Sequence, residues 1–186
     1  HFSPVAVVKP SPDHRIELSD DAFLRPLTED DVTRAYVDGL NDPVVHRFLV
    51  GPRSNRQTDA SVRAFVRGNI DDPYAVLFGL FVQGALCGTA RLHDIKDGNA
   101  WLGLAIFDRS LWGKGWGTQV VTGVTAFALT HLDVRVVKAV IEKENVASRR
   151  AFDRAGYMHA AAKDFTEDGQ LKELWERDGV RAHEEH

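Results

Sequence analysis

Hydrophobic and polar positions along the N-terminal third of the chain predict two short strands followed by two helices. The strands are Arg15–Leu18 and Phe23–Pro26, and the helices are Glu29–Leu40 and Thr58–Asn69. Thr28 with Asp31 three residues on resembles a capping box, which marks the start of the first helix. The second helix carries apolar residues three and four positions apart, as a single buried helix face requires.

The apolar pattern then changes to short runs separated by turn signals, which is typical of strands. The predicted strands are Ala75–Gln83, Leu86–Ile95, Ala100–Phe107, Val134–Ile141, and a final pair near Tyr157–Phe165 and Leu171–Asp178. Hairpin turn chemistry is present at Gln83-Gly84, at residues 96–99 and at residues 167–170. A long apolar segment predicts a helix over about Gly117–Leu132, and a further helix is predicted over Val146–Ala155.

The order of these elements, ββααβββαβαββ, predicts one mixed α/β (α+β) domain over residues 15–178. Residues 1–14 contain three prolines and are expected to form an irregular arm. Residues 179–186 are expected to form a tail.

Composition narrows the class of protein. The chain has 186 residues, 44% of them hydrophobic and 27% charged, which is typical of a soluble globular domain. Its net charge of -4 argues against generic nucleic-acid binding. Cys87 is the only cysteine, so no intrachain disulfide can form. No apolar run is long enough to span a bilayer, and we expect a cytoplasmic enzyme without a membrane or nucleic-acid partner.

The sharpest local motif is the glycine-rich run from Trp112 to Gln119, between a predicted strand and a predicted helix. Its glycines permit a tight turn and close approach of a ligand, and the following helix presents unpaired N–H groups. Lys114 can add a positive charge, so the run predicts a phosphate site. The spacing fits neither a P-loop nor a dinucleotide fingerprint, and a plain strand-to-helix turn stays an alternative.

Several further motifs occur in order along the chain. They are Leu24-Arg25-Pro26-Leu27, Glu29-Asp30-Asp31, Leu40-Asn41-Asp42-Pro43, Gly103-Leu104-Ala105-Ile106, the run from Trp112 to Thr118, Asn145 with Ser148, Phe152, and Gly156-Tyr157. With these motifs the chain resembles the GNAT superfamily of acyl-CoA N-acyltransferases, over about Phe23 to Tyr157. Within the superfamily it is similar to the branch that holds ribosomal-protein N-terminal and amino-sugar acetyltransferases.

The resemblance implies a GNAT fold, with a mostly antiparallel sheet splayed between the family's fourth and fifth strands and flanked by about four helices. It also implies acetyl-CoA as co-substrate, held by the glycine-rich run, by the fourth strand and by the helix after the fifth. The implied cofactor-binding residues are Ala105, Ile106, Phe107, Trp112, Gly113, Lys114, Gly115, Trp116, Gly117, Thr118, Asn145, Ser148 and Phe152. Trp112 departs from the family's usual Arg or Gln.

The usual proton-handling residues of the family are replaced here. Trp101 stands where many relatives have a glutamate base, and Phe152 stands where many have a tyrosine acid. Three other residues are candidates for the catalytic base or a substrate contact: His93, His46 and Glu142. Without an evident carboxylate base, an α-amine or amino-sugar amine suits the site better than lysine, because more of it is neutral at pH 7.

Basic residues cluster in the segment that borders the acceptor pocket in the family. Arg47, Arg53 and Arg56 are candidate contacts for an anionic acceptor, and a solvated surface is the alternative. We therefore expect an N-acetyltransferase for a nucleotide-linked amino sugar or another small anionic amine. The alternatives are a peptide N-terminal acetyltransferase, an enzyme for another small amine, and a non-catalytic CoA-binding domain. No metal site is predicted, and the chain is expected to be a monomer or homodimer.

Overall fold

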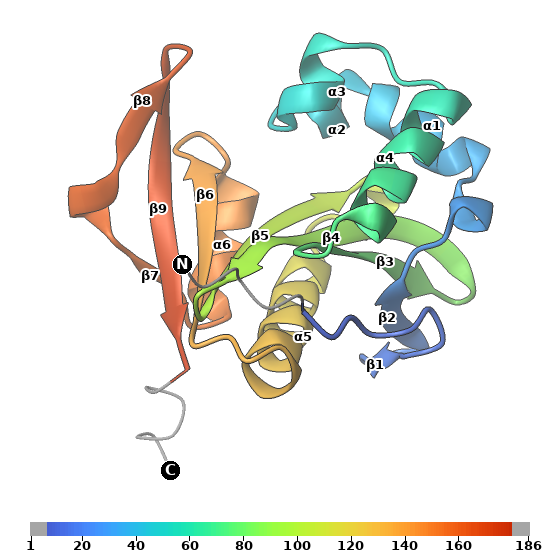
Figure 1. Ribbon diagram of the computed structural model, residues 1–186. Coiled ribbons are helices and arrows are strands. Elements are labelled where there is room, and N and C mark those ends of the chain that lie inside the picture. The colour runs from blue at the N-terminus through green and yellow to red at the C-terminus, as the bar shows by residue number, and fades with distance from the viewer. Residues whose placement is uncertain (1–6, 180–186) are drawn as a thin grey trace.

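A computed structural model describes residues 7–179, which form one twisted, mixed sheet with helices on both faces (Figure 1). The strands are β1 (Ile16–Glu17), β2 (Ala22–Pro26), β3 (Val76–Val82), β4 (Ala85–Lys96), β5 (Asn99–Ile106), β6 (Val136–Glu142), β7 (Met158–His159), β8 (Phe165–Glu167) and β9 (Gln170–Asp178). Their order is β1-β2-β3-β4-β5-β6-β9-β7, and β8 pairs with β9. Neighbours are antiparallel except β5 and β6, which are parallel.

Two-residue turns fix the register of the long hairpins. Gln83 and Gly84, between β3 and β4, have φ values of 50° and 82°, and Asp97 and Gly98, between β4 and β5, have 54° and 77°. Paired positive φ angles twist the backbone in the sense that the flanking strands require, and Gly or Asp tolerates them. The predicted turn chemistry is therefore the reason that the central strands were readable from the sequence.

The helices are α1 (Arg34–Asn41), α2 (Pro43–His46), α3 (Val50–Ser54), α4 (Asp59–Asp71), α5 (Trp116–His131) and α6 (Val146–Arg154). Figure 1 shows α1–α4 gathered over one face of β3–β5, with α5 across the opposite face. Each side has its own apolar core: Val121 and Val124 of α5 belong to one, and Tyr36 and Val62 of α1 and α4 belong to the other. Among the helices of the described residues, none is both long and apolar enough to cross a bilayer.

The prediction of one continuous helix from Glu29 to Leu40 is wrong, because the segment forms two separate elements. Residues 29–31 form one 3-10 turn, and α1 starts only at Arg34. Asp31 does complete a capping box with Thr28, but Arg25 also binds its carboxylate at 2.6 Å. Thr33 is extended and its hydroxyl accepts the Tyr36 N–H, so it acts as a second N-cap and begins a separate helix.

Two other segments differ from the prediction. Residues 43–54 carry the short helices α2 and α3, where no helix was predicted. Asp42 caps α2 with its side chain, and Pro43 occupies the first helical position, where its missing N–H costs nothing. The predicted strand Tyr157–Phe165 is instead β7, a 3-10 turn over Ala161–Lys163, and the start of β8.

The sheet splits between β5 and β6. The two strands pair only through Asn99, Ala100 and Trp101 of β5, and beyond these residues they diverge. In Figure 1 the strands β6, β9, β7 and β8 accordingly form a wing apart from β2–β5. The predicted GNAT splay is confirmed.

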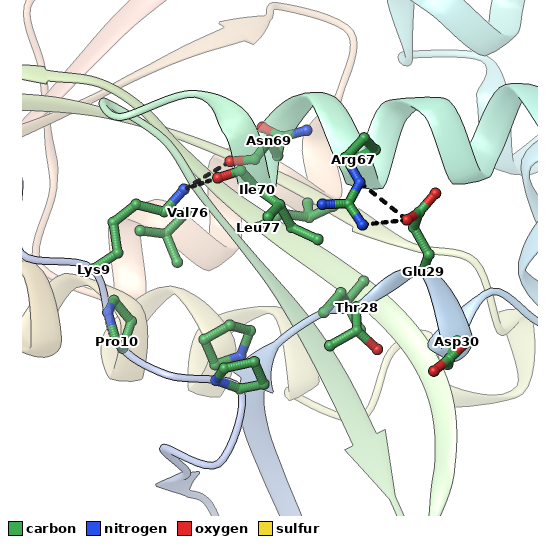
Figure 2. A pocket seen from close by; sticks show the side chains of 13 residues that line it. Lys9, Pro10, Thr28, Glu29, Asp30, Arg67, Asn69, Ile70, Val76 and Leu77 are labelled. Carbon is green, nitrogen blue, oxygen red and sulfur yellow. Dashed lines mark hydrogen bonds and ion pairs between the residues drawn. The ribbon is translucent and has the colours of Figure 1, made fainter.

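The described part of the N-terminal arm, residues 7–14, has no helix or strand but is anchored to the domain. Nζ of Lys9 donates hydrogen bonds to the main-chain carbonyls of Asn69, Ile70 and Asp72, at the C-terminal end of α4. Figure 2 shows Lys9 at one side of a pocket of about 490 Å³ and Arg67, paired with Glu29, at the other. A lysine at this position satisfies carbonyls that a helix end leaves without partners.

Candidate active site

Two adjoining cavities lie at the split in the sheet. The loop cavity, of about 610 Å³, lies between the glycine-rich run, the end of β5 and the start of α6. The split cavity, of about 630 Å³, lies between α3, α4, β5, β6 and the β8–β9 hairpin. Six residues line both: Phe48, Leu49, Leu104, Ala105, Asn145 and Ser148. A long ligand can therefore enter through one cavity and present its end in the other.

The wall of the loop cavity is built to receive an anion. Gly113 and Gly115 have φ values of 76° and 86°, and a Cβ on either would meet no atom within 4 Å. Gly115 is the N-cap of α5, and its carbonyl accepts a hydrogen bond from the Gln119 N–H, which begins the helix. The N–H groups of Trp116, Gly117 and Thr118 therefore lack intrahelical acceptors and lie at the positive end of the helix dipole.

Trp112 and Gly117 hold this loop against its neighbours. The indole N–H of Trp112 donates to the main-chain carbonyl of Ile106 at 2.9 Å, which ties the loop to the end of β5. A Cβ on Gly117 would lie 3.3 Å from Cβ of Ala151, so glycine permits α5 and α6 to approach closely. The side chain of Lys114 is exposed and does not line the loop cavity.

The edge of β5 faces the split with main-chain groups that pair with no neighbouring strand beyond Trp101. The N–H of Phe107 donates to the Cys87 carbonyl on the β4 side, and main-chain groups alternate in direction along a strand. Those of Leu104 and Ile106 therefore point away from β4, toward the split. Phe107 itself is buried against Tyr36 and lines neither cavity, so the structure does not bring it together with the other predicted cofactor-binding residues.

Comparison with known families identifies this arrangement. The model of the acetyltransferase (GNAT) domain matches residues 22–158. The chain belongs to the GNAT acetyltransferase family. It is an acetyl-CoA-dependent N-acetyltransferase. Comparison with curated proteins gives no match.

Solved structures of GNAT proteins share the fold. RimL, a ribosomal alpha-N-protein acetyltransferase in complex with coenzyme A, has a TM-score of 0.78 at 20% identity, over 89% of this chain and 98% of that one. Mycobacterium smegmatis RimJ, in complex with a CoA-disulfide, has 0.77 at 16%, over 91% and 89%. An aminoglycoside acetyltransferase, AAC(6')-Ib, in complex with coenzyme A has 0.74 at 16%, over 88% and 98%.

In this GNAT enzyme the start of α6 lines both cavities. The side chain of Asn145 caps α6 by accepting the Ser148 N–H, at 3.2 Å. Phe152, one turn later, lines the split cavity and packs edge-on against Tyr157. The hydroxyl of Tyr157 is buried and bonded to Thr125 at 2.6 Å, and burial raises its pKa. Tyr157 therefore does not replace the acidic hydroxyl that Phe152 lacks.

Glu142 is the predicted catalytic candidate that the structure places in the split cavity. Its Oε1 accepts hydrogen bonds from Nζ of Lys172 at 2.9 Å and from Nη1 of Arg53 at 3.0 Å. Burial acts to raise the pKa of Glu142, but the hydrogen bonds from Lys172 and Arg53 outweigh it and lower that pKa. A carboxylate held in its ionised form is a weak proton acceptor for an ammonium group.

The two histidine candidates lie outside both cavities. His93, near the end of β4, bonds through Nδ1 to the Asp94 carboxylate at 2.8 Å and is paired with Trp101 across the sheet. His46 ends α2, and its Nδ1 is buried without a hydrogen-bond partner among the described residues. Neither imidazole lines the cavity where an amine can meet a thioester.

The three predicted arginine contacts have different surroundings. Arg53 forms an ion pair with Glu142. Arg56 is exposed and lines neither cavity. Arg47 lines the loop cavity and lies over the Phe48 ring. The cations that line the split cavity are Arg91 of β4 and Lys172 of β9, which the sequence pattern did not indicate.

His159, Asp164 and Glu173 bring ligand-type atoms within 4.8 Å of one another. Nε2 of His159 bonds to the Asp164 carboxylate, and Oε1 of Glu173 accepts hydrogen bonds from Arg149 and from the Trp175 indole. The bond between Arg149 and Glu173 joins α6 to β9, so the cluster is part of an ion-pair network.

Proposed function

We propose that this enzyme transfers the acetyl group of acetyl-CoA directly to the primary amine of a small anionic acceptor, such as a nucleotide-linked amino sugar. The observation that carries the proposal is the pair of adjoining cavities: one presents free N–H groups for a diphosphate, and the other has cationic side chains in its wall. A volume of about 630 Å³ is within the range of small-molecule sites.

The co-substrate fits the loop cavity on three grounds. The N–H groups of Trp116, Gly117 and Thr118 are suited to its pyrophosphate. The outward main-chain groups of Leu104 and the N–H of Ile106 can pair with the amides of its pantetheine arm, as in a strand addition, while the Ile106 carbonyl is bonded to Trp112. Asn145 and Ser148 line the passage between the cavities, where the thioester end is expected.

In the proposed reaction the neutral amine attacks the thioester carbonyl, a C–N bond forms, the C–S bond breaks, and CoA leaves as a thiolate. The amine loses one proton, and the thiolate gains one. Within the described residues, the carboxylates that line the split cavity are Glu142, whose pKa is lowered, and Glu167, at the exposed end of β8. We therefore expect an acceptor amine of low pKa, which is partly neutral before it binds.

A peptide N-terminal amine is the second candidate. Phe65 of α4 and Phe165 of β8 line the split cavity from opposite walls, and both rings are substantially exposed. Such an apolar rim can hold the side chains of an extended peptide. An α-amine also has the low pKa that the site favours.

The test is CoA thiol release from acetyl-CoA with a panel of amines: a nucleotide-linked amino sugar, the free amino sugar, a short peptide and a polyamine. We expect the highest kcat/KM with the nucleotide-linked sugar. Turnover only on the peptide overturns the proposed acceptor in favour of the second candidate. Tight CoA binding without turnover on any of them contradicts the proposed reaction.

Gly103→Val places a side chain in the split cavity at a position where a Cβ meets no atom within 4 Å. We expect it to lower kcat/KM for the acceptor at least tenfold while CoA binding is unchanged. Gly68→Val is the matched control, because Gly68 also has no neighbour within 4 Å and lines neither cavity.

A further inference from the structure

Arg91 has a distinctive position in the wall of the split cavity. It lies on β4 directly opposite Gly103 of β5, and both residues line the cavity. Directly opposed residues of an antiparallel pair project to the same face. Since Gly103 has no side chain, the space beside the Arg91 side chain is left open.

A buried asparagine orients the guanidinium group. Nε of Arg91 donates to Oδ1 of Asn69 at 2.7 Å, and the Asn69 side chain is only 5% exposed. Nδ2 of Asn69 donates to the Phe65 carbonyl at 2.9 Å, and Lys9 binds the carbonyl of Asn69 itself at 2.8 Å. Asn69 is thus fixed from three directions, and its contact with Arg91 involves only Nε.

The two terminal nitrogens of Arg91 have no hydrogen-bond or ion-pair partner among residues 7–179. Two arginines close to the split cavity are paired: Arg53 with Glu142 and Arg149 with Glu173. Lys172, the second cation of the cavity wall, is likewise bonded to Glu142. Arg91 therefore presents a planar, positively charged group with four free N–H donors, a geometry that matches the two oxygens of a carboxylate or phosphate.

We propose that Arg91, positioned by Asn69, binds an oxoanion of the acetyl acceptor and so selects amines that carry a carboxylate or phosphate. This inference rests on the proposed acetyl transfer. The reacting amine is expected near Leu104 and Ala105, where the cavities meet. From the rise of a strand this point is on the order of 3–7 Å along β5 from Gly103, the residue opposite Arg91, so the anion and the amine belong to one small molecule.

The test compares matched acceptors that differ only in the anion: an amino sugar with and without a phosphate, and an α-amino acid with its amide. Arg91→Gln is expected to lower kcat/KM for the anionic member of a pair roughly 10- to 100-fold and to leave the uncharged member unchanged. For the anionic acceptor, the kcat/KM of Arg91→Lys should lie between those of the unchanged enzyme and Arg91→Gln, because lysine keeps the charge but lacks the bidentate geometry of arginine. A loss confined to the amino-sugar pair identifies the anion as a phosphate, and a loss confined to the amino-acid pair identifies it as a carboxylate. Arg56→Gln is the control, since Arg56 lines neither cavity.

Asn69→Asp tests the positioning role. It preserves the shape of the side chain but places a carboxylate against Arg91, so the KM of the anionic acceptor should rise while its kcat and the KM of the uncharged acceptor are retained. If Asn69 has only a structural role, Asn69→Asp changes the KM of both acceptors equally.

Calorimetric binding of the same compounds, measured with CoA present, keeps the test independent of turnover. The proposal for Arg91 is overturned if Arg91→Gln weakens the binding of charged and uncharged acceptors equally, or weakens the binding of neither. Transfer that persists in that case leaves the proposed function standing. Absence of transfer with intact, Arg91-dependent binding of the anionic compound contradicts the proposed reaction and supports the anion site.

Discussion

Glu142 and its two ion-pair partners, Lys172 and Arg53, form the Glu142 cluster, and the stability of the fold depends on the buried charge of Glu142. The Glu142 side chain is 6% exposed, that of Lys172 is 8% exposed and that of Arg53 is 31% exposed. Glu142→Ala removes the carboxylate that accepts the hydrogen bond of Lys172 Nζ and leaves the lysine charge in the protein interior. Removing one partner of a buried ion pair typically destabilises a protein by about 3–5 kcal/mol. For a chain of this length, that loss lowers Tm by roughly 6–20 °C.

The measurement is urea unfolding followed by fluorescence, with Glu144→Ala as control. Glu144 is exposed and lies two residues away, and its replacement should change the free energy of unfolding by less than about 0.5 kcal/mol. Glu142→Leu combined with Lys172→Met should recover most of the loss, because it removes the buried charges together. A Glu142→Ala variant within about 1 kcal/mol of the control would refute the reasoning.

The same cluster predicts a pH dependence of known sign. The pKa of Glu142 is lower in the folded protein, so the unfolded chain binds a proton at a higher pH. The stabilisation is fully present above the unfolded pKa of about 4.3 and is lost as pH falls through the folded pKa. Glu142→Gln should therefore flatten the acid limb of a stability profile. An unchanged acid limb in this variant would count against the cluster as its source.

Three further changes test other parts of the structure. Gly115→Ala introduces a Cβ at φ 86° without a clash, and should cost about 1–2 kcal/mol of stability and weaken CoA binding, both measurable by thermal melting with and without CoA. Trp112→Phe removes the bond to Ile106 and should raise the KM for acetyl-CoA several-fold while KM for the acceptor is unchanged. Thr125→Val leaves the buried Tyr157 hydroxyl unpaired and should destabilise the fold by about 1–3 kcal/mol in urea; equal stability of Thr125→Val and wild type would contradict the role of that bond.

Local chemistry explains which parts of the fold could be predicted from the sequence. The hairpins were readable because Gln83-Gly84 and Asp97-Gly98 specify turns by their backbone angles alone. The break before α1 was missed because it depends on Arg25, a residue of β2, which binds the capping carboxylate of Asp31. Short helices such as α2 depend on packing rather than on periodicity, so they leave a weak pattern.

The candidate site likewise has one part that the sequence predicts and one part that only the fold shows. The glycine-rich run is contiguous, so its anion-binding character follows from a short stretch of sequence. Two charged residues that line the split cavity are held by partners far away in the chain: Glu142 is 89 positions from Arg53, and Arg91 is 22 positions from Asn69. No spacing rule links such residues, and only the folded structure shows that Arg53 is neutralised while Arg91 is available.

The early end of the pairing between β5 and β6 gives the sheet two inner edges as well as its outer ones. An uncovered strand edge is a template for foreign strands and a weak point toward proteases. If the co-substrate covers the β5 edge, acetyl-CoA at a hundred times its Kd adds about 2.7 kcal/mol to the free energy of unfolding. The lifetime of this protein in a cell should then follow the supply of acetyl-CoA: starvation for the metabolite would shorten the survival of the enzyme as well as slow its turnover.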